Sequence, residues 1–262
     1  MAAESRDAEG LEPHGPGWRL GWALAGFAPF VTISAVHLTA KLTHRPRLEA
    51  ATKAMEMPTL GFALGSRMLT ARRTPRTVVT ALLFVGLALS WLGDVTLNGR
   101  IALGLAFFLA AHLCYIAMFQ LAFRRGRPAG WSLLAIPWFL WLVIVVGPRL
   151  GVMLPSVVAY SAILGVMAIW STRGTALTAA GAVLFVGSDT ILAFRTFTPH
   201  LQNDVWKMLV MATYLPAQAL IATGVLDSAA VDAGQSRAMR TSGSPVSSSM
   251  VRWPSSAKPH FS

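Results

Sequence analysis

The stretch TVVTALLFVGLALSWLGDVTL, residues 77–97, is apolar for almost its whole length and carries one acid, Asp94, near its end. Its length matches the ~20 residues that an α-helix needs to cross the hydrocarbon core of a bilayer. A carboxylate at membrane depth costs roughly 2.5–3.5 kcal/mol on insertion scales. The segment therefore predicts a membrane-spanning helix in which Asp94 has a use.

Apolar segments of similar length recur along the chain, and we interpret eight of them as membrane spans. They cover approximately 18–38, 55–69, 77–97, 101–121, 130–146, 150–170, 174–194 and 205–226. Short connections rich in charges, glycine and proline separate most of them, as in RRTPR at 72–76. The predicted fold class is all-α, a polytopic transmembrane helical bundle of about eight spans.

The composition supports a membrane protein and excludes several other classes. Hydrophobic residues make up 54% of the chain and charged residues 13%, whereas soluble domains carry about 25% charged residues. The net charge of +11 would suit nucleic-acid binding, but the basic residues are scattered over loops and tails without a basic stripe. We therefore expect no nucleic-acid partner. A single cysteine, Cys114, excludes an intramolecular disulfide and a cysteine metal cluster.

The two ends of the chain differ from the apolar middle. Residues 1–17 form a polar tail with four acids, which does not have the basic start of a signal peptide. Residues 18–227 form the predicted membrane domain, and 228–262 a disordered Ser/Pro/Arg-bearing tail. Lysine and arginine are more frequent on the side of the two termini, so both termini are predicted to be cytoplasmic. The basic loop after the first span lies on the other side in this orientation and is an exception to the rule. The Ala-, Gly- and Arg-rich composition is typical of a bacterium with GC-rich DNA, so the expected location is the bacterial cell membrane.

A second aspartate, Asp189, lies in the seventh span and matches Asp94 in the third. Both spans run outward in the predicted orientation, with Asp94 17 residues past Thr77 and Asp189 15 residues past Gly174. At ~1.5 Å per residue the two depths agree within about 3 Å. The strings LLFVG at 82–86 and VLFVG at 183–187 are also alike, which leaves an internal duplication open.

Other polar side chains at membrane depth are expected to face the same interior. His112 and Tyr115 are three residues apart in the fourth span, and Tyr214 and Gln218 are four apart in the eighth, so each pair shares one helix face. Lys53 lies at the mouth of the second span. Because polar groups avoid lipid, these side chains are candidates to line the aspartate site.

Plainer interpretations of the same residues stay open. The two aspartates can form an interhelical hydrogen bond or an ion pair with Lys53. His112 can be a packed histidine that donates to a backbone carbonyl, and the tyrosines can be packing residues. Gln218 can bridge two helices. For Glu56, at the start of the second span, we expect a position at the water interface.

Two carboxyl groups close together at low dielectric do not both ionise, so one keeps its proton and the other is charged. Glycosidases use such a pair as a general acid beside a carboxylate that supports an oxocarbenium-like transition state. A proton relay in a transporter is the alternative use of the same pair. A metal site built from Asp94, Asp189 and His112 is a further alternative, which chelator sensitivity would reveal.

Five sequence elements between about residues 52 and 226 occur together and in a known order. They are TKAMEMP at 52–58, ALLFVGLALSWLGD at 81–94, FLAAHLCY at 108–115, GAVLFVGSD at 181–189 and TYLPAQ at 213–218. Through them the chain resembles the YhhN family of eight-span membrane proteins, whose animal members are the TMEM86 lysoplasmalogenases. Ala54, Glu56, Ala111, Leu215 and Pro216 depart from the family pattern, and these departures bear on the shape of the substrate site.

The resemblance implies an enzyme that hydrolyses the vinyl ether bond of lysoplasmalogen to a fatty aldehyde and a glycerophospho-base. A different ether lipid is an alternative substrate, since many bacteria lack plasmalogens. The implied catalytic residues are Asp94 and Asp189, and the implied substrate-binding residues are Lys53, His112, Tyr115, Tyr214 and Gln218. The implied partners are the lysophospholipid and membrane lipids, with no metal and no cofactor. A transporter or proton relay, or a lipid-binding protein without turnover, are the alternative functions.

Overall fold

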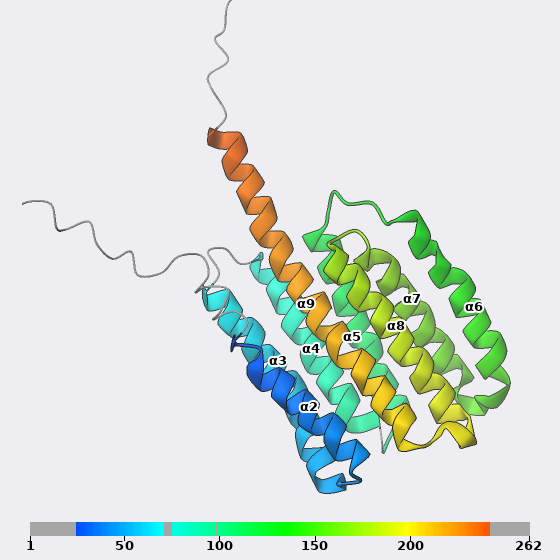
Figure 1. Cartoon of the computed structure of the whole chain (residues 1–262). Helices are drawn as coiled ribbons and strands as arrows, with labels where there is room; N and C mark the ends of the chain where they lie inside the picture. The colour runs from blue at the N-terminus through cyan, green and yellow to red at the C-terminus, as the bar shows by residue number, and fades with distance from the viewer. Residues whose placement is uncertain (1–24, 71–74, 98, 242–262) are drawn as a thin grey trace, which may run out of the picture.

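The computed structural model describes residues 25–70, 75–97 and 99–241, with side chains in the last helix described as far as residue 228. Over these ranges the chain is helical and contains no strand, which confirms the all-α prediction (Figure 1). The α-helices are α2 (Ala28–Leu42), α3 (Pro46–Thr70), α4 (Thr77–Leu97), α5 (Ile101–Ala122), α6 (Ala135–Val146), α7 (Leu154–Ser171), α8 (Ala176–Phe197) and α9 (Asp204–Thr241).

Six helical segments are long and apolar enough to cross a membrane. They comprise α4, α5, α8, the first part of α9, and α6 and α7 together with the short 3₁₀ turns at their ends. The described part of α2 has only 15 residues, and α3 carries charged side chains along its first half. The protein is therefore an integral multi-pass membrane protein, while the count of eight spans and the orientation of the termini stay predictions.

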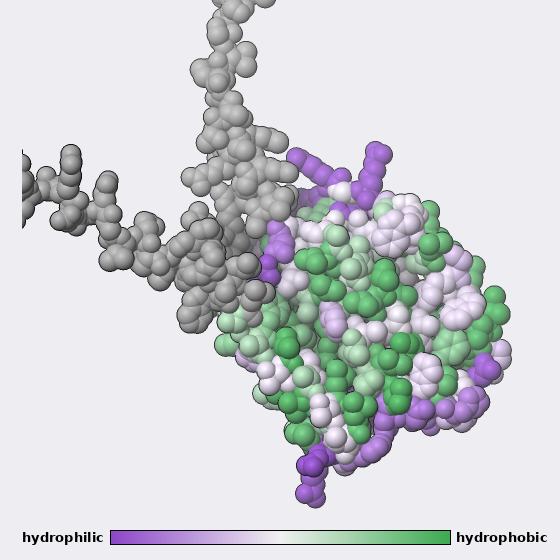
Figure 2. Space-filling view, in the orientation of Figure 1, coloured by the Kyte–Doolittle hydropathy of each residue, from purple (hydrophilic) through white to green (hydrophobic). Residues whose placement is uncertain are grey.

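The visible surface agrees with this assignment. Figure 2 shows apolar side chains over the middle of the bundle and hydrophilic ones gathered at its two ends. Large apolar residues such as Phe62, Val85 and Ile144 are exposed on helices that a bilayer would surround. Exposed apolar area of this extent marks a surface that contacts lipid or another apolar partner.

The helix boundaries differ from the predicted spans in two places. Helix α3 begins at Pro46, well before the expected start of the second span at residue 55, and proline is a favourable residue in the first turn of a helix. The backbone of α9 stays helical to Thr241, whereas the predicted tail starts at residue 228. The rest of that tail, the N-terminal tail 1–17 and the start of the first span lie outside the described residues, so the division into domains stays a prediction.

Helix α9 lies in the middle of the bundle and organises it (Figure 1). It packs along α8 and also contacts α2, α3 and α5. Helix α5 packs along α4 and α7, and α6 lies at the edge against α7. The C-terminal ends of α4 and α8, the beginning of α9 and the first turns of α3 lie at the same end of the bundle (Figure 1). Residues of all four helices line a cavity there.

Candidate active site

Both aspartates line one cavity of about 290 Å³ at this end of the bundle. Helix α4 contributes Asp94, α8 contributes Asp189, α9 contributes Tyr214 and α3 contributes Lys53. Four helices that are far apart in the sequence thus place two carboxyl groups, a phenol and an ammonium group around one space. The cavity also contains the side chains of Lys41, Glu49, Ser188, Arg195 and Lys207.

Asp94 is held by a directional chain of hydrogen bonds. Tyr214 donates its hydroxyl to Oδ2 of Asp94 over 2.8 Å. The same hydroxyl oxygen accepts from Nε2 of Gln218 at 3.2 Å, and Oε1 of Gln218 accepts from the Tyr115 hydroxyl at 2.8 Å. Each link donates toward the carboxylate, and linked hydrogen bonds in a low-dielectric interior polarise one another. The chain therefore favours Asp94 as a hydrogen-bond acceptor.

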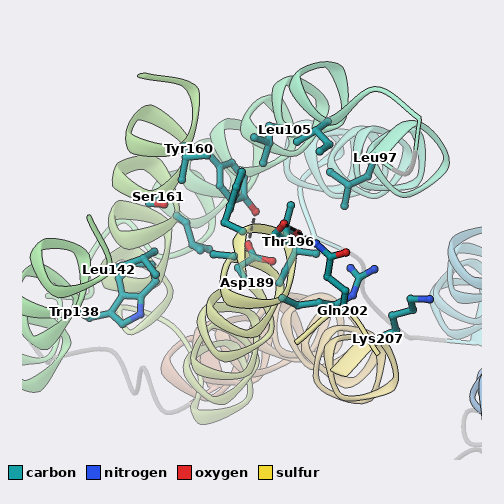
Figure 3. A pocket seen from close by; sticks show the side chains of 17 residues that line it. Leu97, Leu105, Trp138, Leu142, Tyr160, Ser161, Asp189, Thr196, Gln202 and Lys207 are labelled. Carbon is teal, nitrogen blue, oxygen red and sulfur yellow. Dashed lines mark hydrogen bonds between the residues drawn. The ribbon is translucent and has the colours of Figure 1, made fainter. Parts of the chain in front are cut away.

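Asp189 has a separate phenol partner, because Tyr160 of α7 donates a hydrogen bond to its Oδ2. Figure 3 shows the two side chains facing each other at the rim of a second cavity. This second cavity measures about 420 Å³ and runs between α5, α6, α7 and α8. The neighbour Ser188 donates to the carbonyl of Val210 at 3.0 Å and so fixes this part of α8 against α9.

Aromatic rings hold the phenols in place. The ring of Tyr214 lies edge-on to Phe108 at 6.1 Å and to Phe185 at 5.3 Å between centroids. Such edge-to-face pairs add about 0.5–1.5 kcal/mol each beyond the burial of area. A Cβ atom on Gly86 would come within 2.3 Å of the Tyr115 ring, so glycine is needed there for α4 to approach α5. Phe108, Phe185 and Tyr214 thus form a packed aromatic wall that holds the hydrogen-bond chain in place.

His112 lies behind this wall and lines neither cavity. It is fully buried, and its Nδ1 donates to the carbonyl of Phe108 at 2.6 Å. Its ring packs edge-on against Phe185 at 4.8 Å and Tyr160 at 5.4 Å. The Nδ1 bond is the one that the plainer interpretation of His112 expects, while its buried Nε2 has no hydrogen-bond partner among the described residues, so the role of His112 stays a prediction.

Glu56 does not lie at the water interface, and that expectation is wrong. Its side chain is fully buried, with Oε1 at 3.6 Å from Nδ1 of His37 on α2. The early start of α3 explains the error, because it places Glu56 well inside a helix and facing α2. Lys53, one turn earlier, lines the aspartate cavity, but no carboxylate within the described ranges approaches its ammonium group within ion-pair distance.

The proposed metal ligands do not come together. Among the described residues no three His, Cys, Asp or Glu side chains are close enough to share a metal ion. Nδ1 of His112 is bonded to the backbone of its own helix, and its Nε2 has no hydrogen-bond partner among the described residues. The set of Asp94, Asp189 and His112 is therefore not assembled as a ligand set.

Sequence reasoning missed several side chains that the fold brings to the cavities, namely Tyr160, Lys41, Glu49, Arg195 and Lys207. One signal for Tyr160 was available. The chain has only three tyrosines, and two of them were already candidates. All three hydroxyls are hydrogen-bonded in the two networks around the aspartates. The cations were interpreted only as markers of membrane orientation.

The fold and the site define a class, a multi-pass helical membrane protein with two carboxyl groups in a cavity between its helices. The YhhN family profile matches residues 48–225, and the chain belongs to this family. A protein of Mycobacterium bovis named lysoplasmalogenase is 30% identical over 226 residues, which cover 79% of this chain and 83% of that protein. No solved structure matches the chain.

Two mammalian relatives match over a shorter length. Lysoplasmalogenase TMEM86B of Sus scrofa is 37% identical and that of Rattus norvegicus 35% identical, each over 129 residues. These matches cover 48% of this chain and 54% and 52% of the two relatives. The chain thus matches about half the length of these two proteins.

Proposed function

We propose that the protein is an intramembrane hydrolase that cleaves the vinyl ether bond of lysoplasmalogen-type lipids to a fatty aldehyde and a glycerophospho-base. The observation that carries this proposal is that Asp94 and Asp189 line one cavity. The names of the relatives give the substrate class, since all those compared above are called lysoplasmalogenases. The same cavity opens beside an apolar one, as a lipid substrate requires.

A carboxyl pair suits the chemistry of a vinyl ether. A carboxylic acid delivers its proton to the outer alkene carbon, so the C=C π bond is lost and the carbon attached to oxygen becomes an oxocarbenium ion. The ionised neighbour stabilises this cation and takes a proton from the water that attacks it. The product is a hemiacetal. Its collapse breaks the bond to the glycerol oxygen, which takes a proton as the hydroxyl proton leaves, so that water is consumed and the aldehyde is released.

The two aspartates have different surroundings, which favour different roles. Asp94 accepts from Tyr214 at the end of a chain of donors, an arrangement that stabilises a carboxylate. Asp189 lies where the apolar cavity meets the polar one, beside the place available to an alkenyl chain. We assign Asp189 as the general acid and Asp94 as the carboxylate that stabilises the cation and orients water. In this scheme Lys53 and Tyr214 contact the substrate or water. Tyr115, Gln218 and His112 do not contact it, and instead they position Tyr214 and the aromatic wall around it.

Transport through the same aspartates receives less support. Discontinuous helices at the substrate site are typical of many secondary transporters. Pro58 lies inside α3 and Pro216 inside α9, yet both helices continue through them. A proton relay along the aspartates remains the alternative that the experiment below separates from hydrolysis.

Aldehyde release from lysoplasmalogen by the purified protein in detergent tests the proposal. We expect turnover by the wild type, and a loss of at least a hundredfold in kcat for Asp94→Asn and Asp189→Asn, because general acid–base groups contribute about 10²–10⁴. Asp227→Asn is the matched control, since Asp227 pairs with Arg67 and lines neither cavity. A folded wild type without turnover on lysoplasmalogen or on related ether lipids would refute hydrolysis and favour transport.

A further inference from the structure

Arg195 has no role in the reaction as derived so far, yet it lines both cavities. It lies in the last turn of α8, at the end of the bundle where the cavities open. Its Nε is buried and has no hydrogen-bond partner among the described residues. A buried donor without a partner costs about 1–3 kcal/mol, more when the group is charged. A ligand that accepts from Arg195 would remove this cost.

The other cations in the polar cavity are not equivalent to Arg195. Lys41 is paired with Glu49, and Lys207 with Asp204 at 2.7 Å. Lys53 and Arg195 have no carboxylate within ion-pair distance in the described part of the chain. The lining of the polar cavity contains four cationic side chains and three carboxyl groups, one of which is protonated in the proposed mechanism. The cavity therefore has an excess of positive charge and two cations available to an anion.

Most of the residues that line the second cavity are apolar. Leu105 of α5, Leu142 of α6 and Leu164 of α7 are among its apolar walls. It meets the polar cavity at the residues that line both, namely Leu97, Asp189, Leu192, Arg195 and Lys207. Figure 3 shows Asp189 and Lys207 among the side chains of the second cavity. Its volume of about 420 Å³ falls in the lower part of the range of ~300–1,000 Å³ that is typical of ligand sites. An amphiphile with one chain and one charged group matches this pair of spaces.

We propose that Arg195, together with Lys53, binds the phosphate of a single-chain phospholipid at the junction of the two cavities. The chain of the lipid then occupies the apolar cavity. This inference rests on the proposed function, because it names the group by which the substrate is held in that same site. A guanidinium suits this task, since its planar donors bind phosphate oxygens in a bidentate manner.

Anchoring the phosphate also positions the bond to be cleaved. Arg195 follows Asp189 by six residues in α8, which is about 9 Å along the helix axis. The phosphate and the vinyl ether of a lysoplasmalogen sit at opposite ends of one glycerol. A phosphate held at Arg195 therefore brings the vinyl ether to Asp189, and a lipid without phosphate loses this alignment. Arg195 is thus a specificity-determining residue for phosphate-bearing lipids.

The test measures binding of two lipids that cannot be cleaved, a saturated 1-alkyl-ether lysophospholipid and the 1-alkyl-glycerol that lacks its phosphate. Affinities for the purified full-length protein in detergent come from titration calorimetry at fixed salt. We expect the wild type to bind the phosphate-bearing lipid at least tenfold more tightly. Arg195→Gln should remove this preference and leave the affinity for the alkyl-glycerol unchanged, and Arg195→Lys should restore part of it.

Arg149→Gln is the matched control, because Arg149 is exposed at the same end of the bundle, bonds to the carbonyl of Val145 and lines neither cavity. A phosphate preference that Arg195→Gln retains would overturn the proposal. Equal loss of both lipids would also overturn it, since that result indicates a structural role. If Arg195→Gln does not fold, Arg195→Lys and Lys53→Gln decide by the same two affinities. Because neither lipid is cleaved, a protein that shows the preference without turnover would refute hydrolysis alone.

Discussion

Tyr214 donates its hydroxyl to Asp94 over 2.8 Å, and this bond joins α9 to α4 at the candidate site. Tyr214→Phe removes the donor and keeps the ring between Phe108 and Phe185. A hydrogen bond to a charged group contributes about 1.5–3 kcal/mol. We expect kcat/KM for aldehyde release to fall by roughly tenfold to a hundredfold. An unchanged kcat/KM in a folded variant would show that Tyr214 only packs.

Tyr115 acts on Asp94 through Gln218 and Tyr214, so its contribution should depend on Tyr214. Tyr115→Phe alone is expected to lower kcat/KM by about twofold to threefold, because side-chain hydrogen bonds in membrane proteins average ~0.6 kcal/mol. In the Tyr214→Phe background the same change should have almost no effect. A double-mutant cycle of kcat/KM measures this coupling. If the two substitutions lower kcat/KM independently, so that their factors multiply, the hydrogen-bond chain does not couple Tyr115 to Asp94.

The positions of the two aspartates were predictable from the sequence, while most of the cavity was not. Asp94 and Asp189 stand out because an acid in an apolar, membrane-length segment is costly, and that signal is local. The burial of Glu56 depends on how far α3 extends and which face it turns to α2, and neither is local. The place of Arg195 in the cavity was equally hard to predict, because an arginine near a span end is also what membrane orientation requires.

The fold class followed from the same local signals, whereas the extent of the helices did not. The span at 77–97 coincides with α4 because helix formation, apolar composition and the breakers on either side agree there. In α3 and α9 the charged residues outside the apolar window remain helical. A hydropathy window therefore identifies the apolar part of each helix and misses its charged ends. Lys41 and Arg195 lie at such ends of α2 and α8, just beyond the predicted spans that end at residues 38 and 194. Lys207 lies inside the predicted eighth span, but a lysine near a span end was interpreted only as a marker of membrane orientation.

Glu49 should give the protein a dependence on acid pH. It lies before the predicted second span and pairs with Lys41. Partial burial raises the pKa of the Glu49 carboxyl, but the hydrogen bond and charge of Lys41 outweigh it, so the folded-state pKa is below the ordinary 4.5. Folding therefore gains stability from Glu49 above about pH 4.5 and loses it as the pH falls through the lower folded-state value.

The Glu49→Gln variant checks this dependence through thermal unfolding in detergent between pH 3 and 7. The unfolding midpoint of the variant should lie below that of the wild type at pH 7, and the two should converge as the pH falls. Glu56→Gln does not serve as the control, because Glu56 is buried. Asp227→Asn removes a carboxylate paired at the other end of the bundle and should leave the contribution of Glu49 in place. A difference that stays constant over this pH range contradicts the role of the Lys41 pair.

Gly181 sets how closely α8 and α9 approach each other, and this helix contact positions Asp189 relative to Tyr214. A Cβ atom on Gly181 would lie 2.8 Å from the carbonyl oxygen of Ala217 and 2.9 Å from the backbone nitrogen of Ile221, and backbone atoms cannot move aside. Gly181→Ala should destabilise the fold by about 1–3 kcal/mol and lower the unfolding midpoint in detergent. Gly187, on the same helix, has nothing within 4 Å of its Cβ position, so Gly187→Ala should be neutral or stabilising by up to ~1 kcal/mol. Equal midpoints for the two variants would show that the helices separate without penalty.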